Sequence, residues 1–267
     1  MVNQQPYVDV HERFTAWAIE QGVQINKVAP KYFQNRGVGM VATDKIQAGE
    51  GLTKVPPTAL VTAYSVPQKI KDTIGTCTVH GLLTADLCLD AQKRNSSWQA
   101  WRSVWPSEQS FSTIPLNWTP ELQSMLPFAA AGTRAPALLA TGSKHKLTPD
   151  LELLQNQKQK LSADYATVSK AFPNIDEVVF RYHWLLVNTR SFYYLKPGVK
   201  KKPARDDCMA LCPFSDYFNH ADTGCPVTFG ADGITISSDK NYDVGDEIYV
   251  SYGNHSNDFL LTECKEE

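Results

Sequence analysis

The first sixty residues combine one stretch of helical spacing with several short alternating runs. Asp9 can cap a helix that reaches Gly22, because Phe14, Trp17 and Ala18 then share one apolar face. The runs that follow alternate between apolar and polar residues and are closed by turn residues, which predicts short strands. These strands are expected at residues 25–28, 38–42, 51–55 and 59–62.

The apolar spacing changes to a helical period between about residue 65 and residue 176. One predicted helix is centred on residues 82–89, and a second covers residues 149–172 and stops at Pro173. Between them lies an aromatic stripe at helical steps, which we interpret as core packing: Trp98, Trp101 and Trp105.

The last third of the chain begins with a helix near Asp176 and then returns to short strands. The strands are predicted at residues 227–229, 234–237 and 247–252. The order of strands, helices and strands indicates an α+β fold. The turn at residues 44–50 has a loose counterpart at residues 239–247, which we interpret as a local echo rather than a repeat architecture.

The composition is that of an ordinary soluble globular protein, with 42% hydrophobic and 20% charged residues in 267. The net charge is −2, so no global basic field predicts binding to nucleic acid or to a membrane. A basic run at residues 196–205 contains Pro and Gly and is interpreted as a solvated loop, with nuclear import or partner docking as the alternative. The N-terminus lacks the pattern of a signal peptide, and no apolar run approaches the roughly 20 residues that span a bilayer.

Six cysteines are scattered along the chain, and without a secretory signal we expect them to be reduced. Cys208, Cys212 and Cys225 suggest a zinc site at first sight, but no fourth ligand follows at a suitable spacing. We therefore expect no metal site.

Polar residues interrupt an apolar run at residues 211–220, which read Leu-Cys-Pro-Phe-Ser-Asp-Tyr-Phe-Asn-His. Asp216, Asn219 and His220 lie in this run, where an unpaired polar group costs roughly 1–3 kcal/mol. These side chains are therefore expected to bond something specific, either backbone or a ligand. For an isolated Asn-His pair, a turn with a satisfied core histidine is the more common interpretation.

A second motif, Asp-Glu-Ile-Tyr-Val-Ser-Tyr-Gly, lies at residues 246–253. It reads as an alternating strand with Ile248 and Val250 on one face and polar residues on the other. Tyr252 follows on the face of Ile248, immediately before Gly253 ends the strand.

In this order and separation, the two motifs resemble the C-terminal signatures of the SET-domain protein methyltransferases, and most closely those of the Rubisco large-subunit methyltransferase-like subgroup. The resemblance implies a SET fold of short β-strands and small sheets with a mid-domain helical insertion, and S-adenosylmethionine-dependent methyl transfer to a protein lysine. It implies that Asn219 and His220 bind the cofactor and that Tyr252 is the catalytic residue at the methyl-transfer channel. On this basis the chain divides into an N-terminal helix with the first half of the SET domain, a helical insertion and the C-terminal half: 1–64, 65–176 and 177–263.

Two further cofactor-binding groups follow from the resemblance. The run Asn-Arg-Gly-Val-Gly-Met is by itself most often a tight turn, but its place matches the first SET signature, so Arg36, Gly37 and Val38 are expected at the cofactor. Arg190, near the end of the helix predicted to begin near Asp176, suits a surface cation at a helix C-terminus. In the family, an Arg at this place holds the cofactor carboxylate, and we expect that role here.

The sequence departs from the subgroup near its end, where Cys264 stands in place of a second channel aromatic and the subgroup's helical substrate-binding domain is lacking. Two alternatives to lysine methylation are therefore kept: a catalytically impaired SET-fold module that binds cofactor or protein, and methylation of a protein histidine. We expect a protein substrate presenting a lysine, no direct nucleic-acid or membrane binding, a monomer, and a cytoplasmic and/or nuclear location.

Overall fold

The computed structural model describes residues 5–34, 36–124, 149–200 and 203–251. The helices are α1 (Gln5–Glu20), α2 (Gln68–Ile74), α3 (Val79–Ala91), α4 (Gln99–Arg102), α5 (Pro120–Ser124), α6 (Pro149–Ala171) and α7 (Glu177–Arg190). The strands are β1 (Gln24–Ile25), β2 (Val28–Phe33), β3 (Gly37–Ala42), β4 (Gly51–Val55), β5 (Val61–Thr62), β6 (Ser191–Tyr193), β7 (Met209–Leu211), β8 (Asn219–Cys225), β9 (Val227–Gly230), β10 (Gly233–Ser237) and β11 (Glu247–Val250). Within these described ranges, no helix has the length and apolarity needed to cross a membrane.

Helix α1 carries the apolar face that its sequence predicts. Phe14 and Ala18 are fully buried, and the ring of Phe14 stacks on that of Trp17 at 5.7 Å between centroids. The helix begins at Gln5 and ends at Glu20, so the expected cap at Asp9 is wrong: Asp9 lies inside the helix. Burial of the apolar face, rather than one capping side chain, fixes this helix against the rest of the fold.

The short strands form with small shifts from the predicted positions. Strand β4 has the predicted bounds, whereas the single run expected at residues 25–28 is two strands, β1 and β2. They are separate because Lys27 takes a left-handed conformation with φ 56° between them. Strands β6, β7 and β8 were not predicted.

The strands make three small sheets, with the orders β1-β4-β10-β9, β2-β3-β11-β8 and β5-β7-β6. In the second sheet, β11 lies between two strands from distant parts of the chain. It pairs antiparallel with β3, where Ile248 faces Met40, and parallel with β8, where Tyr249 faces Asn219. This sheet therefore brings the two C-terminal motifs and the Gly-rich N-terminal motif side by side.

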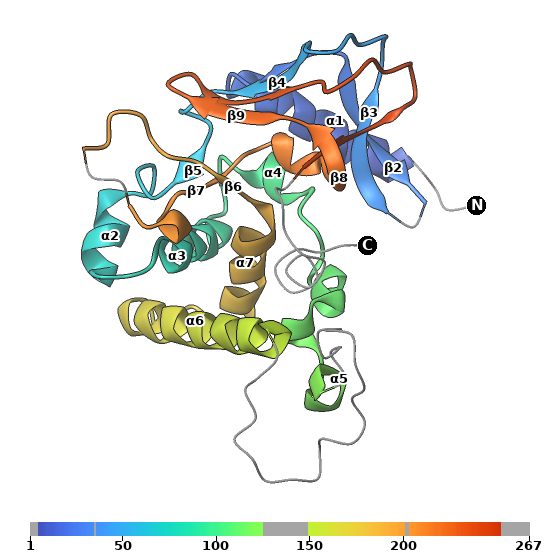
Figure 1. Cartoon of the computed structure of the whole chain (residues 1–267). Coiled ribbons are helices and arrows are strands. Elements are labelled where there is room, and N and C mark those ends of the chain that lie inside the picture. The colour runs from blue at the N-terminus through green and yellow to red at the C-terminus, as the bar shows by residue number, and fades with distance from the viewer. Residues whose placement is uncertain (1–4, 35, 125–148, 201–202, 252–267) are drawn as a thin grey trace.

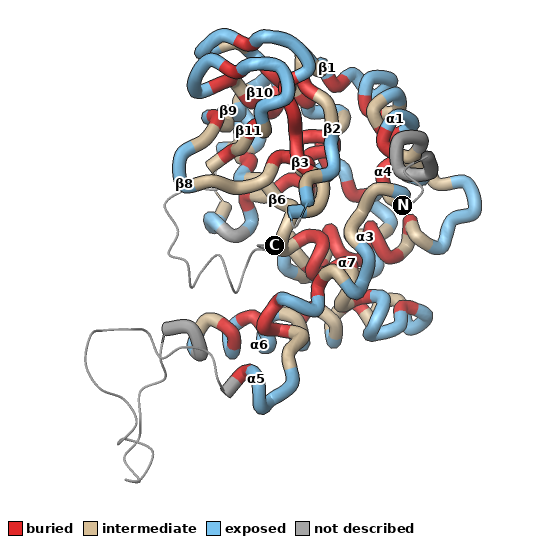
Figure 2. Tube along the Cα trace, turned by 90° about the vertical axis from the view of Figure 1, so that its right-hand side faces the viewer, coloured by how far each residue is buried: buried red, intermediate tan, exposed pale blue. Residues whose placement is uncertain are grey.

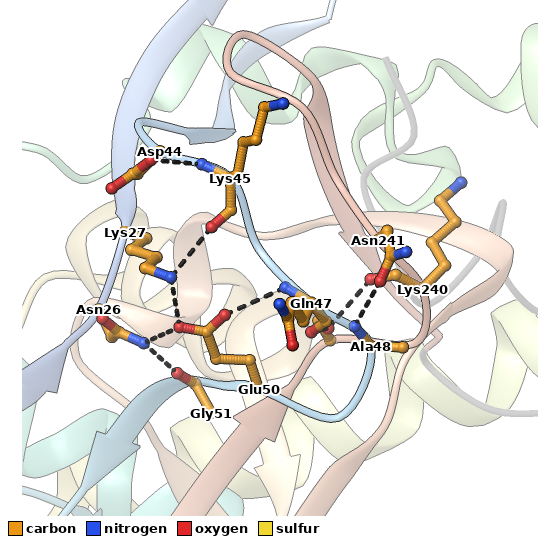
Figure 3. A network of polar contacts seen from close by, with 11 residues as sticks. Asn26, Lys27, Asp44, Lys45, Gln47, Ala48, Glu50, Gly51, Lys240 and Asn241 are labelled. Carbon is orange, nitrogen blue, oxygen red and sulfur yellow. Dashed lines mark hydrogen bonds and ion pairs between the residues drawn. The ribbon is translucent and has the colours of Figure 1, made fainter.

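The two similar turns of the sequence lie against each other (Figure 3). Ile46 and Tyr242 exchange backbone hydrogen bonds of 3.0 Å in both directions, and Ala48 N donates to Asn241 Oδ1 at 2.9 Å. The strands on either side of the turns also pair, β3 with β11 and β4 with β10. The local echo is thus a contact between two strand–turn–strand units, and it closes one side of the core.

Helices α2 to α7 come between the first and last groups of strands, and α3, α6 and α7 pack together (Figure 1). Their shared cluster includes Phe180 and Trp184, which are both buried, and Figure 2 shows buried positions along α3 and α7. Asp164 of α6 is only 2% exposed and accepts hydrogen bonds from Thr78 Oγ1 at 2.6 Å and Trp184 Nε1 at 3.0 Å. This carboxylate therefore joins the start of α3 and the middle of α7 to α6. The division of the chain at residues 64 and 176 stays a prediction.

The tryptophan stripe packs in the core, as predicted, although only one turn of it is helical. Helix α4 covers Gln99–Arg102, and Trp101 within it is 1% exposed. Its ring stacks on Trp17 at 6.3 Å and meets Trp98 and Trp105 edge to face. The stripe thereby ties α1 to the helical part of the molecule.

Candidate functional site

The first C-terminal motif crosses the core in an unusual tight turn. Phe214 is fully buried and has φ 71°, a conformation that is unfavourable for a bulky side chain. The 3₁₀ helix Ser215–Tyr217 follows, in which Asp216 N donates to Cys212 O at 3.2 Å. The turn directs the Asp216 side chain inward and brings Asn219 to the start of β8.

Asp216 is a buried carboxylate with a cationic and a neutral donor. Its Oδ2 lies 3.6 Å from Arg190 Nη1 and accepts a hydrogen bond from Trp101 Nε1 at 3.4 Å. Arg190 Nη1 also donates to the backbone oxygen of Asp216 at 2.9 Å. Burial raises the pKa of Asp216, and the neighbouring Arg190 guanidinium opposes that rise. Arg190 is therefore anchored beside the motif that contains Asn219.

The Arg190 guanidinium keeps donors for a ligand. In the described part of the chain only its Nη1 has a bonding partner, so Nε and Nη2 are available, and 26% of the side chain is exposed. A planar guanidinium backed by a buried carboxylate suits bidentate recognition of a second carboxylate. This arrangement favours a binding role over that of a surface cation at a helix end.

Glu247 joins the two C-terminal motifs through its two carboxylate oxygens. Asn219 Nδ2 donates to Oε1 at 3.0 Å, and Tyr249 Oη donates to Oε2 at 2.6 Å. Arg36 Nη2 forms an ion pair with Oε2 at 2.8 Å, and Arg36 Nη1 donates to Tyr249 Oη. Burial and the adjacent Glu247 carboxylate raise the pKa of Tyr249, so its phenol stays a donor. The network fixes the amide plane of Asn219 and leaves its Oδ1 without a donor among the described residues.

The Gly-rich motif on β3 lets the backbone of this strand lie close to the side chains of Asn219 and Glu247. A Cβ atom on Gly39 would lie 2.6 Å from Asn219 Nδ2 and 2.8 Å from Glu247 Oε1, so only glycine fits without displacing them. Gly37 begins the strand with φ 69°, and Val38 is half-buried next to it. The motif therefore lies directly behind the Asn219–Glu247 hydrogen bond.

The structure brings together all but one of the predicted site groups. Arg36, Gly37 and Val38 lie on or beside β3, Asn219 and His220 start β8, and Arg190 ends α7. Tyr252 lies outside the described residues, so its place beside Asn219 stays a prediction. Strand β11 ends at Val250, after Tyr249 has paired with Asn219.

Sequence reasoning missed three side chains at this site. Glu247 connects the motifs, and Trp101 bonds the Asp216 carboxylate in addition to packing. His11 Nδ1 lies 2.6 Å from Tyr217 Oη across the fold, and burial lowers the pKa of His11. The indole N–H of a buried tryptophan requires an acceptor, which is a signal that the sequence did contain.

A cleft of about 460 Å³ opens beside this network, between the β2–β3 hairpin and the turn before β11. Arg36, Glu247 and Tyr249 line it together with Phe33 and Lys240. Its volume is in the range of small-molecule sites, and its lining mixes aromatic rings with both signs of charge. The cleft therefore reaches the network that holds Asn219.

The family model described as "SET domain" matches residues 37–253 of this chain. A ribosomal lysine N-methyltransferase, set11 of Schizosaccharomyces pombe, is 38% identical over 111 residues, which are 41% of this chain and 28% of that protein. SET domain-containing protein 4 of Artemia parthenogenetica is 27% identical over 90% of this chain and 57% of its own length. Human N-lysine methyltransferase SETD6 is 23% identical over 83% of this chain and 46% of its own. The matched part of this chain thus covers 28%, 57% and 46% of the lengths of these three relatives.

Solved structures share the fold. The SET domain of LSMT bound to lysine and AdoHcy aligns with a TM-score of 0.73 at 15% identity, over 97% of this chain and 57% of that one. Rubisco LSMT bound to AdoMet aligns with a TM-score of 0.72, also at 15% identity. At this level of identity the likeness establishes a SET fold of mixed helices and small sheets, as predicted.

Proposed function

Because this chain belongs to the SET-domain family, we propose that it transfers a methyl group from S-adenosylmethionine to a lysine side chain of a protein. The observation that carries the proposal is that Arg190 and Asn219 are both held at the turn around Asp216, each with unused hydrogen-bonding capacity. These residues fit a zwitterionic nucleoside cofactor. Arg190 offers paired donors for a carboxylate, and Asn219 offers an amide oxygen as an acceptor. When bound, the cofactor supplies a methyl group on a sulfonium centre.

In this proposal the protein side chains bind the cofactor and fix its orientation. Arg190 holds the cofactor carboxylate, and Asp216 keeps the guanidinium in place from behind. Asn219 and His220 hold the rest of the cofactor, with Glu247 fixing the Asn219 amide. Asp216 and Glu247 hold Arg190 and Asn219 without a ligand, which reduces the ordering entropy that binding requires.

The acceptor lysine must be neutral to attack. With a pKa near 10.4 it is charged at pH 7, and deprotonation costs roughly 4.6 kcal/mol. Removal from water lowers that pKa, and alignment of the amine supplies much of the remaining rate enhancement. We assign Tyr252 to orientation of the amine, because a phenol with an ordinary pKa near 10 is a poor general base.

The direct test is transfer of labelled methyl groups from S-adenosylmethionine into the proteins of a cell extract. Asn219→Ala should abolish cofactor binding in a calorimetric titration and abolish transfer. Asn26→Ala is a matched control, since Asn26 Nδ2 also donates to a glutamate, Glu50 Oε1, at 3.0 Å, but beside the start of β4 (Figure 3). Unchanged binding in Asn219→Ala, or equal losses in both variants, would defeat the site assignment.

Cys264 supports a second candidate, a module that binds cofactor or protein without turnover. If the missing channel aromatic has abolished activity, Cys264→Tyr should gain methyl transfer while cofactor affinity stays constant. Tyr252→Phe should lower transfer in an active protein and change nothing in a silent one. Mass spectrometry of the labelled extract decides between lysine and the alternative acceptor, histidine.

The remaining expectations are part of the same proposal: a monomer, in the cytoplasm or nucleus, that contacts a protein substrate and neither nucleic acid nor membrane. A net charge of −2 supports the last point. Light scattering at micromolar concentration tests the monomer, and a mass near twice the 29.8 kDa of the chain would contradict it.

A further inference from the structure

A second cleft, of about 490 Å³, lies between the C-terminal end of α3, helix α4 and helix α7. It shares no described lining residue with the cleft at Arg36. Lys93, Arg94 and Arg102 line it, and we call it the basic cleft. None of these residues has a role in the proposed methyl transfer.

Positive charge predominates in the basic cleft. Asp90 is a carboxylate beside it; it is 3% exposed, lies 3.1 Å from Lys93 Nζ through Oδ1 and accepts from Ser96 Oγ through Oδ2. A second acid that interacts with Lys93, Asp86, is 4% exposed, whereas three cations line the cleft. Among the described lining residues there is no carboxylate. The cleft is therefore an electropositive hollow in a mildly acidic protein.

The two arginines are arranged differently. Arg102 is fixed, because Nη1 donates to Asp90 O at 3.5 Å and Nη2 to Ala91 O at 3.3 Å at the end of α3. Arg94 is exposed and has no ionic or hydrogen-bonding partner in the described part of the chain. A fixed guanidinium beside one that is free to close on a ligand suits an oxyanion with several acceptor oxygens.

Aromatic rings limit the shape of the cleft. Trp105 and Tyr182 form part of its wall. The Trp105 ring is held edge to face against Trp101 at 5.6 Å and His183 at 6.1 Å, and Tyr182 Oη donates to Pro106 O at 2.9 Å. These contacts fix the orientation of both rings in the wall of the cleft.

We propose that the basic cleft binds a phosphomonoester group, carried either by a phosphorylated protein side chain or by a small phosphorylated molecule. Arginine forks match phosphate oxygens, and the volume suits a compact ligand. A nucleic-acid strand requires a row of cations along several phosphates, whereas here the cations converge on one hollow. The proposal goes beyond methyl transfer and does not depend on it.

Calorimetric titration of the full chain at constant ionic strength tests this site. The probes are a capped Gly-phosphoserine-Gly peptide, the same peptide with serine, glycerol phosphate, and a single-stranded RNA hexamer. The phosphopeptide should bind at least about tenfold more tightly than the serine peptide. Arg94→Glu should weaken that binding about tenfold or more, and Arg94→Lys should retain part of it. Lys69→Glu on α2 is the charge-matched control, because Lys69 is also exposed and unpaired in the described region, and it should leave affinity unchanged.

The outcomes divide cleanly. Tighter binding of the phosphopeptide than of glycerol phosphate identifies a protein source, and equal binding identifies a small molecule; both support the proposal. Equal affinity for the phosphorylated and serine peptides, no binding of either phosphate probe, or the same loss in Arg94→Glu and Lys69→Glu overturns it. Tighter binding of the RNA hexamer, sensitive to Arg94→Glu, overturns it in favour of nucleic acid.

Discussion

Two buried carboxylates, one among the helices and one beside the sheets, are built from similar parts and yet differ in charge balance. Asp164 and Asp216 both accept a hydrogen bond from a tryptophan indole, Trp184 and Trp101 respectively. The second donor to Asp164 is the neutral hydroxyl of Thr78, whereas Asp216 faces a guanidinium.

The difference favours a structural role for Asp164 and supports the proposed ligand-binding role of Arg190 beside Asp216. The donors to Asp164 come from the helices that it joins, and the indole N–H and the hydroxyl are each spent on it. Arg190 instead has donors left over after it has contacted Asp216. Asp216, whose cationic partner keeps free donors, is therefore the better candidate of the two for a place in a ligand site.

Among the variants that compare the two carboxylates, the largest expected change in cofactor affinity follows removal of the Arg190 guanidinium. Arg190→Ala should weaken S-adenosylmethionine binding about 100-fold, since a charge-assisted pair contributes about 1.5–3 kcal/mol. Arg181→Ala is the matched control on the same helix, because Arg181 Nε donates to Asn117 Oδ1 at 2.8 Å within the helical part. It should lower stability and leave affinity unchanged in the same titration; equal losses of affinity would erase the distinction between the two regions.

Removal of the structural carboxylate should act on stability alone. Asp164→Ala leaves the Thr78 hydroxyl and the Trp184 N–H without their acceptor, which should reduce the free energy of unfolding by about 3 kcal/mol. Urea unfolding measures the loss, and a cofactor titration of the folded variant should match the wild type. A change in affinity without a change in stability would reverse the assignment.

Asp86 of α3 sharpens the contrast, because it is 4% exposed and has no hydrogen-bond donor in the described part of the chain. Burial raises its pKa to about 6 from an ordinary 3.8. The folded state therefore loses stability as the pH rises from about 4 through about 6, where the unfolded chain is ionised and the folded protein resists ionisation. Asp86→Asn should stabilise the protein by about 2 kcal/mol at pH 7.5 and by almost nothing at pH 4. Unfolding curves at both values test this, and an equal gain at both would exclude ionisation as the cause.

The smallest expected effect is at the glycine behind Asn219. Gly39→Ala places a methyl group within 2.6 Å of Asn219 Nδ2 and should shift the amide, weakening cofactor binding about fivefold, or roughly 1 kcal/mol. Gly51→Ala on β4 is the control, since a Cβ there meets no atom within 4 Å. A loss of affinity in both variants would point to a general effect of alanine on the sheets.

The hydrophobic pattern predicted the helices and strands whose apolar periodicity is clear in the sequence. Other elements form because of contacts with distant parts of the chain. The apolar face of α1 and strand β4 follow from periodicity. Strand β8 reads Asn-His-Ala-Asp-Thr-Gly-Cys, which has little strand propensity, and it forms because it pairs with β11.

At the candidate site, too, local sequence patterns predicted some residues, whereas long-range contacts could not be predicted. The motifs and the resemblance predicted Asn219 and Arg190 as site residues, but the partners that hold them lie far away along the chain. Trp101 and Asp216 are separated by 115 residues, and nothing local to either predicts their contact. The left-handed conformation of Phe214 was equally unpredictable, because only the packing around a buried ring can impose it.

One matched pair of titrations tests the central claim, that Asp216 serves the ligand through Arg190 and Asp164 serves only the fold. Asp216→Asn and Asp164→Asn each replace a buried carboxyl group with an amide of the same shape. S-adenosylmethionine should bind Asp216→Asn at least about 30-fold more weakly than the wild type and bind Asp164→Asn within about twofold of it. Equal affinities in the two variants would contradict the account.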